Sequence, residues 1–396
     1  MSQSAVAVAD APGRGRLAVL DGIRGWASLA VLLFHVLPET NRSLLPELDS
    51  APVAMLCDGS LAVYVFFILS GEALSAGYLR AGDLGIVRTL AARRYLRLTV
   101  PILLASALVW AAMASGLDAH RAAAAALRSD WLDGFLRFAP SLPGLLRYAL
   151  RDVYFDPPPA QHYVPLLWTM HVELLGSCVV FGLLALLHGW AARARLACYA
   201  AALLLLALFD AALLGFVIGM LLGEARQRGL LERLRRSRWR WPAILLGLAL
   251  LLGIAGVRAL AHHDATLRYL LRAYLGHARD APVALANPLL MNANAFGLFL
   301  LVALLPGLAR ALGGRLSRWL GAISFPLYLV QFAVLITLTS WLAVWLVDPA
   351  RPARAVLYGI ALVAIAASLL LAWGFAQVER QALRLANAAV ARLLGV

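Results

Sequence analysis

The feature that most constrains this chain is a series of ten apolar segments, each close to the length needed to cross a membrane. A bilayer core requires about 20 apolar residues of helix, and a helix satisfies its backbone hydrogen bonds within one segment. The composition agrees, since 62% of the residues are hydrophobic and 14% are charged. We therefore expect an all-α polytopic membrane protein with about ten transmembrane helices. The expected segments are residues 17–37, 59–79, 98–115, 164–187, 195–208, 211–224, 242–261, 287–306, 320–347 and 354–377.

The arginines predict how these helices are oriented. All 35 residues counted as lysine or arginine are arginine. If the amino terminus lies inside, 22 arginines fall in inner segments and 12 in outer ones, while Arg24 lies within the first helix. Because cytoplasmic loops are enriched in basic residues, we expect both termini in the cytoplasm. The net charge of +14 then reflects these loops, and we expect no nucleic acid partner.

This topology predicts an inner tail (residues 1–16), a transmembrane domain (residues 17–378) and a second inner tail (residues 379–396). The longest outer loop, residues 116–163, combines aromatic side chains with five arginines and ends in "FDPPPAQHY". Such a loop predicts one or two amphipathic helices on the outer membrane face, followed by a rigid proline stretch.

Histidines and cysteines give only a weak indication of metal. The histidines of the second outer loop, residues 262–286, are His262, His263 and His277. This short cluster has no matched partner elsewhere in the chain, so we expect no metal. The cysteines are Cys57, Cys178 and Cys198. Their wide spacing predicts small buried hydrophobic side chains rather than a disulfide framework or a metal site.

The first apolar segment, "LDGIRGWASLAVLLFH" (Leu20–His35), carries three titratable side chains. Arg24 and His35 are eleven residues apart, so both point from one helix face, about 16 Å apart along the axis. Asp21 precedes Arg24 by three residues and can pair with it. Anchoring of the helix end is the alternative for Asp21, and a hydrogen-bonded core histidine is the alternative for His35. Ionisable groups are expensive in lipid and usually functional, which favours a site.

Five further stretches follow this segment. They are "DGSLAVYVFFILSG" (Asp58–Gly71), "RRYLRLTVP" (Arg93–Pro101), "PLLWTMHVELLGS" (Pro165–Ser177), "GAISFPLYLVQF" (Gly321–Phe332) and "VERQALR" (Val378–Arg384). Together with Arg24 and His35, this ordered set resembles the acyltransferase 3 family, and the resemblance spans nearly the whole chain. Members of that family are integral membrane enzymes that move acyl groups, often acetyl, from acyl-CoA to extracytoplasmic glycans or other acceptors.

The resemblance implies an acyltransferase that transfers groups other than amino-acyl groups. Its donor would be acyl-CoA, most simply acetyl-CoA. Its acceptor would be a hydroxyl of an extracytoplasmic carbohydrate or lipid, as in the O-acetylation of a cell-envelope polysaccharide. Its location would be the inner (cytoplasmic) membrane of a bacterium.

Acyl transfer to a hydroxyl needs a base and stabilisation of an oxyanion, and histidine is the usual base near neutral pH. We predict that His35 acts as general base or carries the acyl group. Glu173, in the fourth helix, is predicted to fix the tautomer of His35, as a carboxylate does in catalytic triads. His171 is an alternative partner or a second base. Arg24 and Asp21 complete the predicted catalytic set.

The donor and acceptor sides follow from charge and aromaticity. CoA phosphates favour arginine forks, and Arg93, Arg94 and Arg97 stand at the inner mouth of the third helix. Arg24 also lies toward the inner side, and membrane anchoring is the alternative for the group of three. The predicted substrate-binding residues are Trp168, Tyr328, Gln331, Phe66 and Phe67. Helix packing is the alternative for the tryptophan and the two phenylalanines.

Three positions depart from the family pattern. Gln331 stands where the family often has histidine, Glu72 where it usually has an aromatic residue, and His171 where it more often has serine or proline. A second function class, a transporter or flippase for a glycan or lipid precursor, also accommodates charges along a membrane helix. The sequence has no evident inverted repeat and no paired broken helices, which favours the enzyme.

Overall fold

The structure is a computed structural model that describes residues 12–156, 159, 161–257 and 287–394. Within these residues it is helical and has no β-strand, as the sequence predicts. Eight helices of the described residues are long and apolar enough to cross a membrane. A ninth span results if α16 (Pro288–Leu304) and α17 (Pro306–Leu312), which meet at 102°, count as one. The chain is therefore an all-α multi-pass membrane protein.

The eight spans overlap eight of the ten expected segments, although the third, expected at 98–115, begins at Leu84 and so includes Arg93, Arg94 and Arg97. Their main helices are α1 (Pro12–Phe34), α3 (Gly59–Ala81), α4 (Leu84–Ala114), α9 (Thr169–Leu186), α10 (Ala192–Phe209), α13 (Arg240–Leu248), α18 (Arg315–Val334) and α20 (Arg354–Leu394). The segment expected at 287–306 is the bent pair. The segment expected at 211–224 is α11 (Leu214–Gln227), whose 14 residues give about 21 Å of helix, less than the hydrocarbon thickness.

Helices α1 and α18 approach each other closely through glycine. A Cβ atom on Gly25 would lie 2.5 Å from the backbone nitrogen of Gly321, so neither helix could come this near with a larger residue there. Small residues at such contacts are typical of membrane helices, which associate by close packing rather than by the hydrophobic effect. The contact brings together the two helices that carry Arg24 and Tyr328.

Helix α11 packs against α3 with a similar glycine stripe. Gly215, Gly219 and Gly223 are spaced by four residues and therefore share one face. A Cβ atom on Gly219 would lie 2.1 Å from the backbone oxygen of Ile68. This close contact holds the short α11 inside the bundle, where most of its residues are buried.

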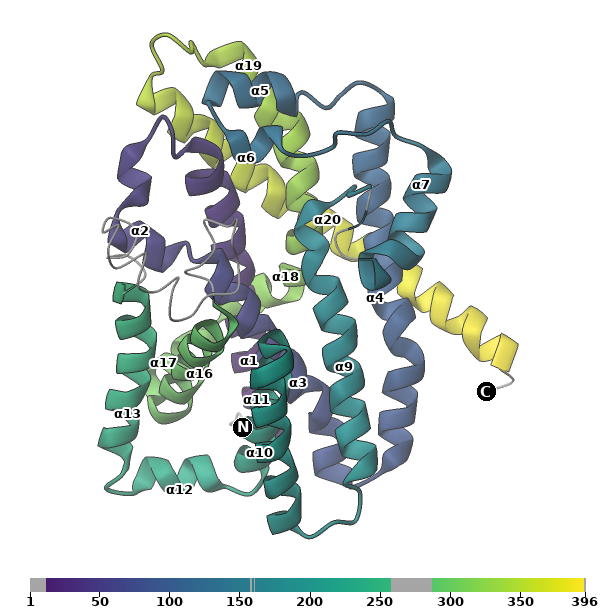
Figure 1. Cartoon of the computed structure of the whole chain (residues 1–396), viewed down its shortest axis with the longest axis vertical. Helices are drawn as coiled ribbons and strands as arrows, with labels where there is room; N and C mark the ends of the chain where they lie inside the picture. The colour runs from purple at the N-terminus through teal and green to yellow at the C-terminus, as the bar shows by residue number, and fades with distance from the viewer. Residues whose placement is uncertain (1–11, 157–158, 160, 258–286, 395–396) are drawn as a thin grey trace, which may run out of the picture.

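Short helices form most of the expected outer loop, and the prediction of one or two helices there was wrong. They are α5 (His120–Leu127), α6 (Asp130–Asp133), α7 (Leu142–Arg147) and α8 (Val153–Phe155). Helix α5 ends because Arg128, which follows it, adopts a left-handed conformation. Ser129 and Ser141 then cap the first turns of α6 and α7. Helix α5 packs on α19 (Ser340–Leu346), and both lie with α6 at the top of Figure 1.

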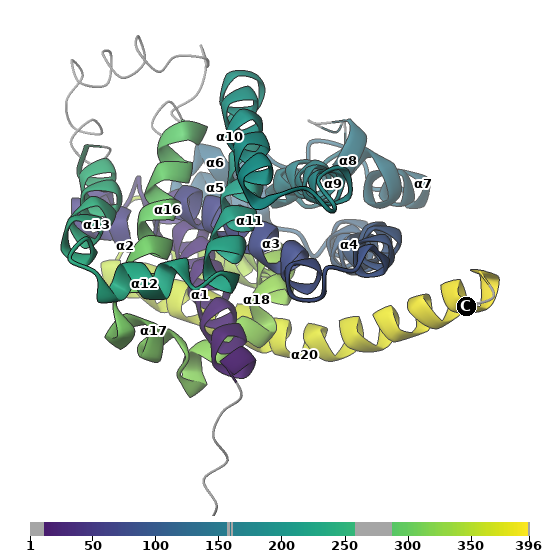
Figure 2. The same ribbon diagram turned by 90° about the horizontal axis from the view of Figure 1, so that it is seen from below.

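The opposite end of the bundle carries α12 (Leu230–Arg236), at the bottom of Figure 1. Helices α10 and α13 pack loosely on the rest of the bundle and expose leucines such as Leu204 and Leu245, as expected of surfaces that face lipid. Figure 2 shows that the carboxyl-terminal part of α20 runs away from the other helices. A small helix, α2 (Ala51–Leu56), precedes α3.

Candidate active site

Six helices (α1, α3, α4, α9, α18 and α20) surround a cavity of about 390 Å³, which we call the arginine cavity. Its charged lining residues are Arg24, Arg94, Arg97, Arg380, Glu173 and Glu379. Phe66, Phe67 and Phe325 contribute apolar surface. Four guanidinium groups against two carboxylates leave an excess of positive charge, and the volume falls in the range of ligand pockets. The cavity can therefore hold an anionic ligand that also has apolar parts.

Arg94 and Glu173 form an ion pair in this cavity, and each side chain is only 12% exposed. The Nε atom of Arg94 also donates to Ser177 Oγ at 2.8 Å. Ser70 Oγ of α3 donates to the Glu173 carboxylate at 2.6 Å. Glu173 is thus held by groups from two neighbouring helices, and its charge is neutralised within the cavity.

A second, smaller cavity of about 90 Å³ adjoins the first, and we call it the histidine cavity. His35 and Trp168 line it, and Val63 and Tyr328 line both cavities. The Tyr328 hydroxyl donates to the backbone oxygen of Leu166 and lies 2.8 Å from the Thr169 hydroxyl, so its ring is fixed in place. Val63 and Tyr328 therefore form the wall between the two cavities.

Arg24 lines the arginine cavity and His35 the histidine cavity. Because the two cavities share a wall, this placement agrees with the prediction that both side chains point from one face of the first helix. Asp21 pairs with Arg24 at 3.5 Å, as the spacing predicts, with both side chains partly exposed.

The His35 imidazole contacts α18 and the outer loop. Its Nδ1 atom lies 3.2 Å from the Gln331 amide oxygen. Its ring stacks on Trp131 of α6, with ring centroids 5.4 Å apart and planes 13° apart. Trp131 in turn packs edge-on against Phe135. The outer loop therefore supplies one face of the surroundings of His35, which sequence reasoning did not predict.

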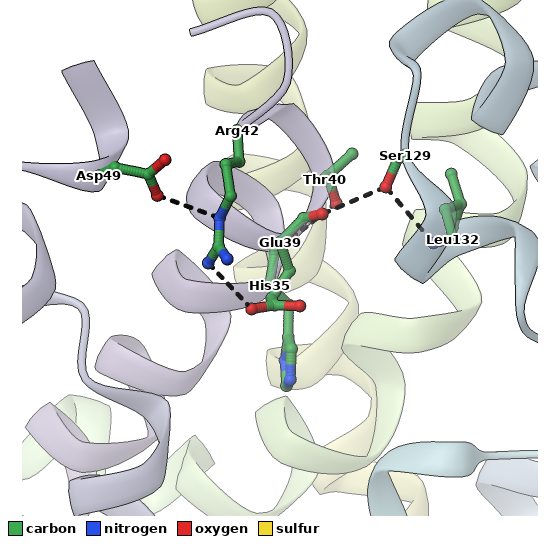
Figure 3. Close-up of polar contacts among 7 residues, drawn as sticks. All are labelled: His35, Glu39, Thr40, Arg42, Asp49, Ser129 and Leu132. Carbon is green, nitrogen blue, oxygen red and sulfur yellow. Dashed lines mark hydrogen bonds and ion pairs between the residues drawn. The ribbon is translucent and has the colours of Figure 1, made fainter. Parts of the chain in front are cut away.

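The backbone of His35 begins a π-helical turn, His35–Glu39, that several side chains fasten. Thr40 Oγ1 donates to the His35 carbonyl at 2.6 Å, and Ser129 Oγ donates to the Glu39 carbonyl at 3.1 Å. Arg42 joins the Glu39 carboxylate, at 3.3 Å, to Asp49, at 3.1 Å. Figure 3 shows the His35 ring pointing away from this Arg42 cluster. The turn thus separates the imidazole from the charges beyond it.

A third cavity, of about 490 Å³, lies at the outer-loop end of the bundle, and we call it the outer cavity. Its polar lining residues include Asp118, His120 and Arg121, and its aromatic ones are Phe138 and Trp341. The buried His120 is hydrogen-bonded through Nε2 to the backbone oxygen of Phe135, at 3.1 Å. Phe135 packs on Trp131, which stacks on His35, so a series of contacts leads from His120 of the outer cavity to His35.

The structure gives two predicted site residues, Glu173 and His171, other neighbours than expected. Glu173 contacts Arg94 and Ser70 rather than His35, because its helix faces the arginine cavity. The His171 Nδ1 atom is hydrogen-bonded to the backbone oxygen of Tyr154, in the outer loop. The assignment of Glu173 or His171 as the partner of His35 was therefore wrong.

Two further predictions are corrected in part. Arg93 is exposed and lines no described cavity, whereas its neighbours Arg94 and Arg97 line the arginine cavity. Gln331 is fully buried and contacts His35, so it is not placed to touch a substrate directly. Trp168 is 52% exposed and lines the histidine cavity, so helix packing does not account for it.

Sequence reasoning also missed three residues. Ser70 donates a hydrogen bond to Glu173 and lines the arginine cavity. Arg380 lines the same cavity from α20; its place in the acidic motif "VERQALR" was the available signal. Trp131 carried no signal beyond its position in an aromatic loop.

Glu72, one of the three departures from the family pattern, is fully buried and pairs with Arg226 of α11 at 3.0 Å. Neither residue lines any of the three cavities, and the pair joins α3 to α11. The histidines of the predicted second outer loop, residues 262–286, lie outside the described residues.

Comparison with known families adds to this geometry. A family model described as "Acyltransferase domain", that of the acyltransferase 3 family, matches residues 17–373, nearly the whole chain. Comparisons with curated proteins and with solved structures gave no match.

Proposed function

The chain belongs to the acyltransferase 3 family, and from this premise we propose that it moves an acyl group from acyl-CoA to a hydroxyl of an extracytoplasmic carbohydrate or lipid. The family match supports a membrane acyltransferase in general. The observation that supports the finer proposal is the pair of adjoining cavities, one rich in arginine and one lined by His35. A phosphate-bearing donor needs positive charge, which the arginine cavity offers, and a reacting hydroxyl needs a base, which His35 offers.

The arginine cavity suits the donor. Guanidinium groups bind phosphates through paired hydrogen bonds, and CoA carries several phosphates. Arg24, Arg97 and Arg380 offer such groups, while Arg94 is largely engaged by Glu173. The apolar surface from Phe66 and its neighbours suits the pantetheine arm. We therefore assign phosphate binding to the arginines, and we place the thioester near Tyr328, at the wall between the cavities.

The histidine cavity suits the chemical step. It is the smaller of the two adjoining cavities, so we assign only the reacting groups to it. In the proposed step, His35 Nε2 takes the proton of the acceptor hydroxyl as the hydroxyl oxygen forms a bond to the acyl carbon. The carbon–sulfur bond then breaks, and His35 returns the proton to the thiolate that leaves. No net proton is gained or lost.

The outer cavity suits the body of the acceptor. Its volume of about 490 Å³ falls in the range of ligand pockets and is larger than the 90 Å³ of the histidine cavity, so we assign the sugar ring to it. Trp341 and Phe138 offer faces for stacking on a sugar ring, and Asp118 and Arg121 offer groups for its hydroxyls or acidic substituents. This arrangement supports an acceptor larger than one reacting group, such as an envelope polysaccharide.

We also propose that the two substrates reach the site from opposite sides of an inner membrane. Helix α12, rich in arginine, and the outer-loop helices lie at opposite ends of the bundle (Figure 1). By the positive-inside tendency, the α12 end faces the cytoplasm, where acyl-CoA is made. The outer cavity then opens to the extracytoplasmic side.

Acetyl transfer by the purified protein tests the proposal. The protein would be reconstituted in nanodiscs with radiolabelled acetyl-CoA and envelope polysaccharide from a strain that lacks the gene, and label on the polysaccharide would be measured. We expect transfer, and mass spectrometry of envelope glycans and lipids with and without the gene should show the same acyl group. Absence of both signals would contradict the enzyme and favour a transporter.

The donor assignment has a matched control. Arg97→Gln should raise the KM for acetyl-CoA about tenfold, since a hydrogen bond to a charged group contributes roughly 1.5–3 kcal/mol. Arg93→Gln, four residues away on the same helix but outside the cavity, should leave that KM unchanged. Equal effects of the two substitutions would show that the arginines act by membrane anchoring.

A further inference from the structure

We propose that Gln331 positions His35 for catalysis by fixing which imidazole nitrogen carries the proton. The inference deepens the proposed function and rests on it, because it concerns the proposed base. It assigns Gln331 a role that the sequence analysis gave to Glu173. The evidence is a short chain of hydrogen bonds that runs from α18 to the imidazole.

The first step is the orientation of the Gln331 amide. Its nitrogen donates to the backbone oxygen of Tyr328 at 3.2 Å, one turn earlier in α18. The amide oxygen is therefore the atom that faces His35, at 3.2 Å from Nδ1. An oxygen can only accept here, so Nδ1 must carry the hydrogen. In a neutral imidazole the other nitrogen, Nε2, then has the free lone pair, which a general base requires.

The second step is the orientation of the ring. The near-parallel stack on Trp131 fixes the plane of the imidazole, and the hydrogen bond to Gln331 fixes its rotation. The backbone is held as well, because Thr40 binds the His35 carbonyl. With both angles restrained, Nε2 is confined to one direction. Gln331 is a positioning residue in this arrangement and does not itself react.

The third step is the choice of a neutral partner. Gln331 is fully buried, and an unpaired carboxylate at such a position would carry a large desolvation cost. The only carboxylate predicted for this role, Glu173, is instead neutralised by Arg94 in the neighbouring cavity. An amide can orient His35 without adding a charge, so it does not favour the protonated imidazole before the substrate arrives.

Two substitutions at Gln331 test the proposal through kinetics. Gln331→Met keeps the volume but removes the acceptor, so kcat should fall about 10- to 100-fold with the KM for acetyl-CoA unchanged. Gln331→Glu restores an acceptor and adds a charge. A carboxylate beside an imidazole favours the imidazolium, so kcat should return at high pH. The acid limb of its pH profile should move upward by about 1 pH unit or more.

A chemical probe reads the same property without any acyl transfer. Diethyl pyrocarbonate modifies the unprotonated imidazole, and mass spectrometry of the His35 peptide follows the rate as a function of pH. We expect the pH of half-maximal modification to rise by about 1 unit in Gln331→Glu. Ser340→Ala serves as the control. Ser340 is also buried, but its hydroxyl donates to the backbone oxygen of Leu335, five residues earlier in the chain, and not to His35. It should shift nothing.

The outcomes separate this inference from the proposed function. A shifted modification profile with no acetyl transfer by the wild-type protein would contradict the enzyme and leave the positioning intact. Transfer by the wild type with kcat of Gln331→Met within twofold of it would overturn the positioning. The positioning would also be overturned if Gln331→Glu shifted neither the pH dependence of kcat nor that of His35 modification. Because Gln331→Glu is nearly isosteric, it tests the proposal even if Gln331→Met does not fold.

Discussion

The ion pair between Arg94 and Glu173 gives a prediction that separates folding from donor binding. Both side chains are 12% exposed, so removal of one charge leaves the other nearly buried and uncompensated. Such a loss costs about 3–5 kcal/mol. We expect about 3 kcal/mol for Arg94→Gln, because Ser70 still donates to the Glu173 carboxylate. The double variant Arg94→Gln/Glu173→Gln removes both charges, and should lose only about 1 kcal/mol.

The measurement is a double-mutant cycle on thermal unfolding in nanodiscs, with KM for acetyl-CoA determined for each variant. Glu173→Gln leaves Arg94 nearly buried and uncompensated, so it should also cost about 3 kcal/mol. The two single losses together should then exceed the loss of the double variant by about 5 kcal/mol, which is the expected coupling. If the loss in the double variant equals the sum of the two single losses, the two residues are not coupled and the reasoning fails. Glu173→Gln frees Arg94 for phosphate, so it should lower the KM if the arginine cavity binds the donor.

Three further predictions concern the fold and the topology. Arg226→Met should cost about 3 kcal/mol of stability, seen as a lower melting temperature, because it leaves the fully buried Glu72 carboxylate without the guanidinium at 3.0 Å; an unchanged melting temperature would contradict the pair. Gly219→Ala should cost about 2 kcal/mol, because its Cβ would lie 2.1 Å from a backbone oxygen of α3, and stability equal to wild type would refute that contact. In a version without native cysteines, Ser43→Cys should react with an impermeant thiol reagent on intact cells and Ser237→Cys only after lysis; the reverse pattern would invert the proposed topology.

The sequence predicted the long spans and the common face of Arg24 and His35, because both depend on local properties. Hydrophobic length identifies a span, and helical periodicity alone relates two residues eleven positions apart. The short α11 was harder to interpret. Its glycines at positions 215, 219 and 223 are visible in the sequence, but the partner that they allow it to approach, α3, is not.

The contacts of the candidate site could be predicted less well. The partner of Glu173 depends on how α9 is rotated relative to α1 and α4, and no local pattern specifies that rotation. Trp131 reaches His35 only because short capped helices fold the outer loop back over the bundle. Gln331 contacts His35 because glycines let α18 approach α1. These features are tertiary, and the motifs marked the residues without giving their neighbours.

The most direct test of the central claim is the acetyl transfer rate of His35→Gln. Glutamine has a similar size and polarity but cannot act as a base at neutral pH, so folding should be retained and should be checked by the melting temperature. Since general base catalysis contributes roughly 10²- to 10⁴-fold, we predict that kcat falls by at least 10²-fold while the KM for acetyl-CoA, set by the arginine cavity, stays the same. A folded His35→Gln protein whose kcat is within a few-fold of wild type would contradict the account.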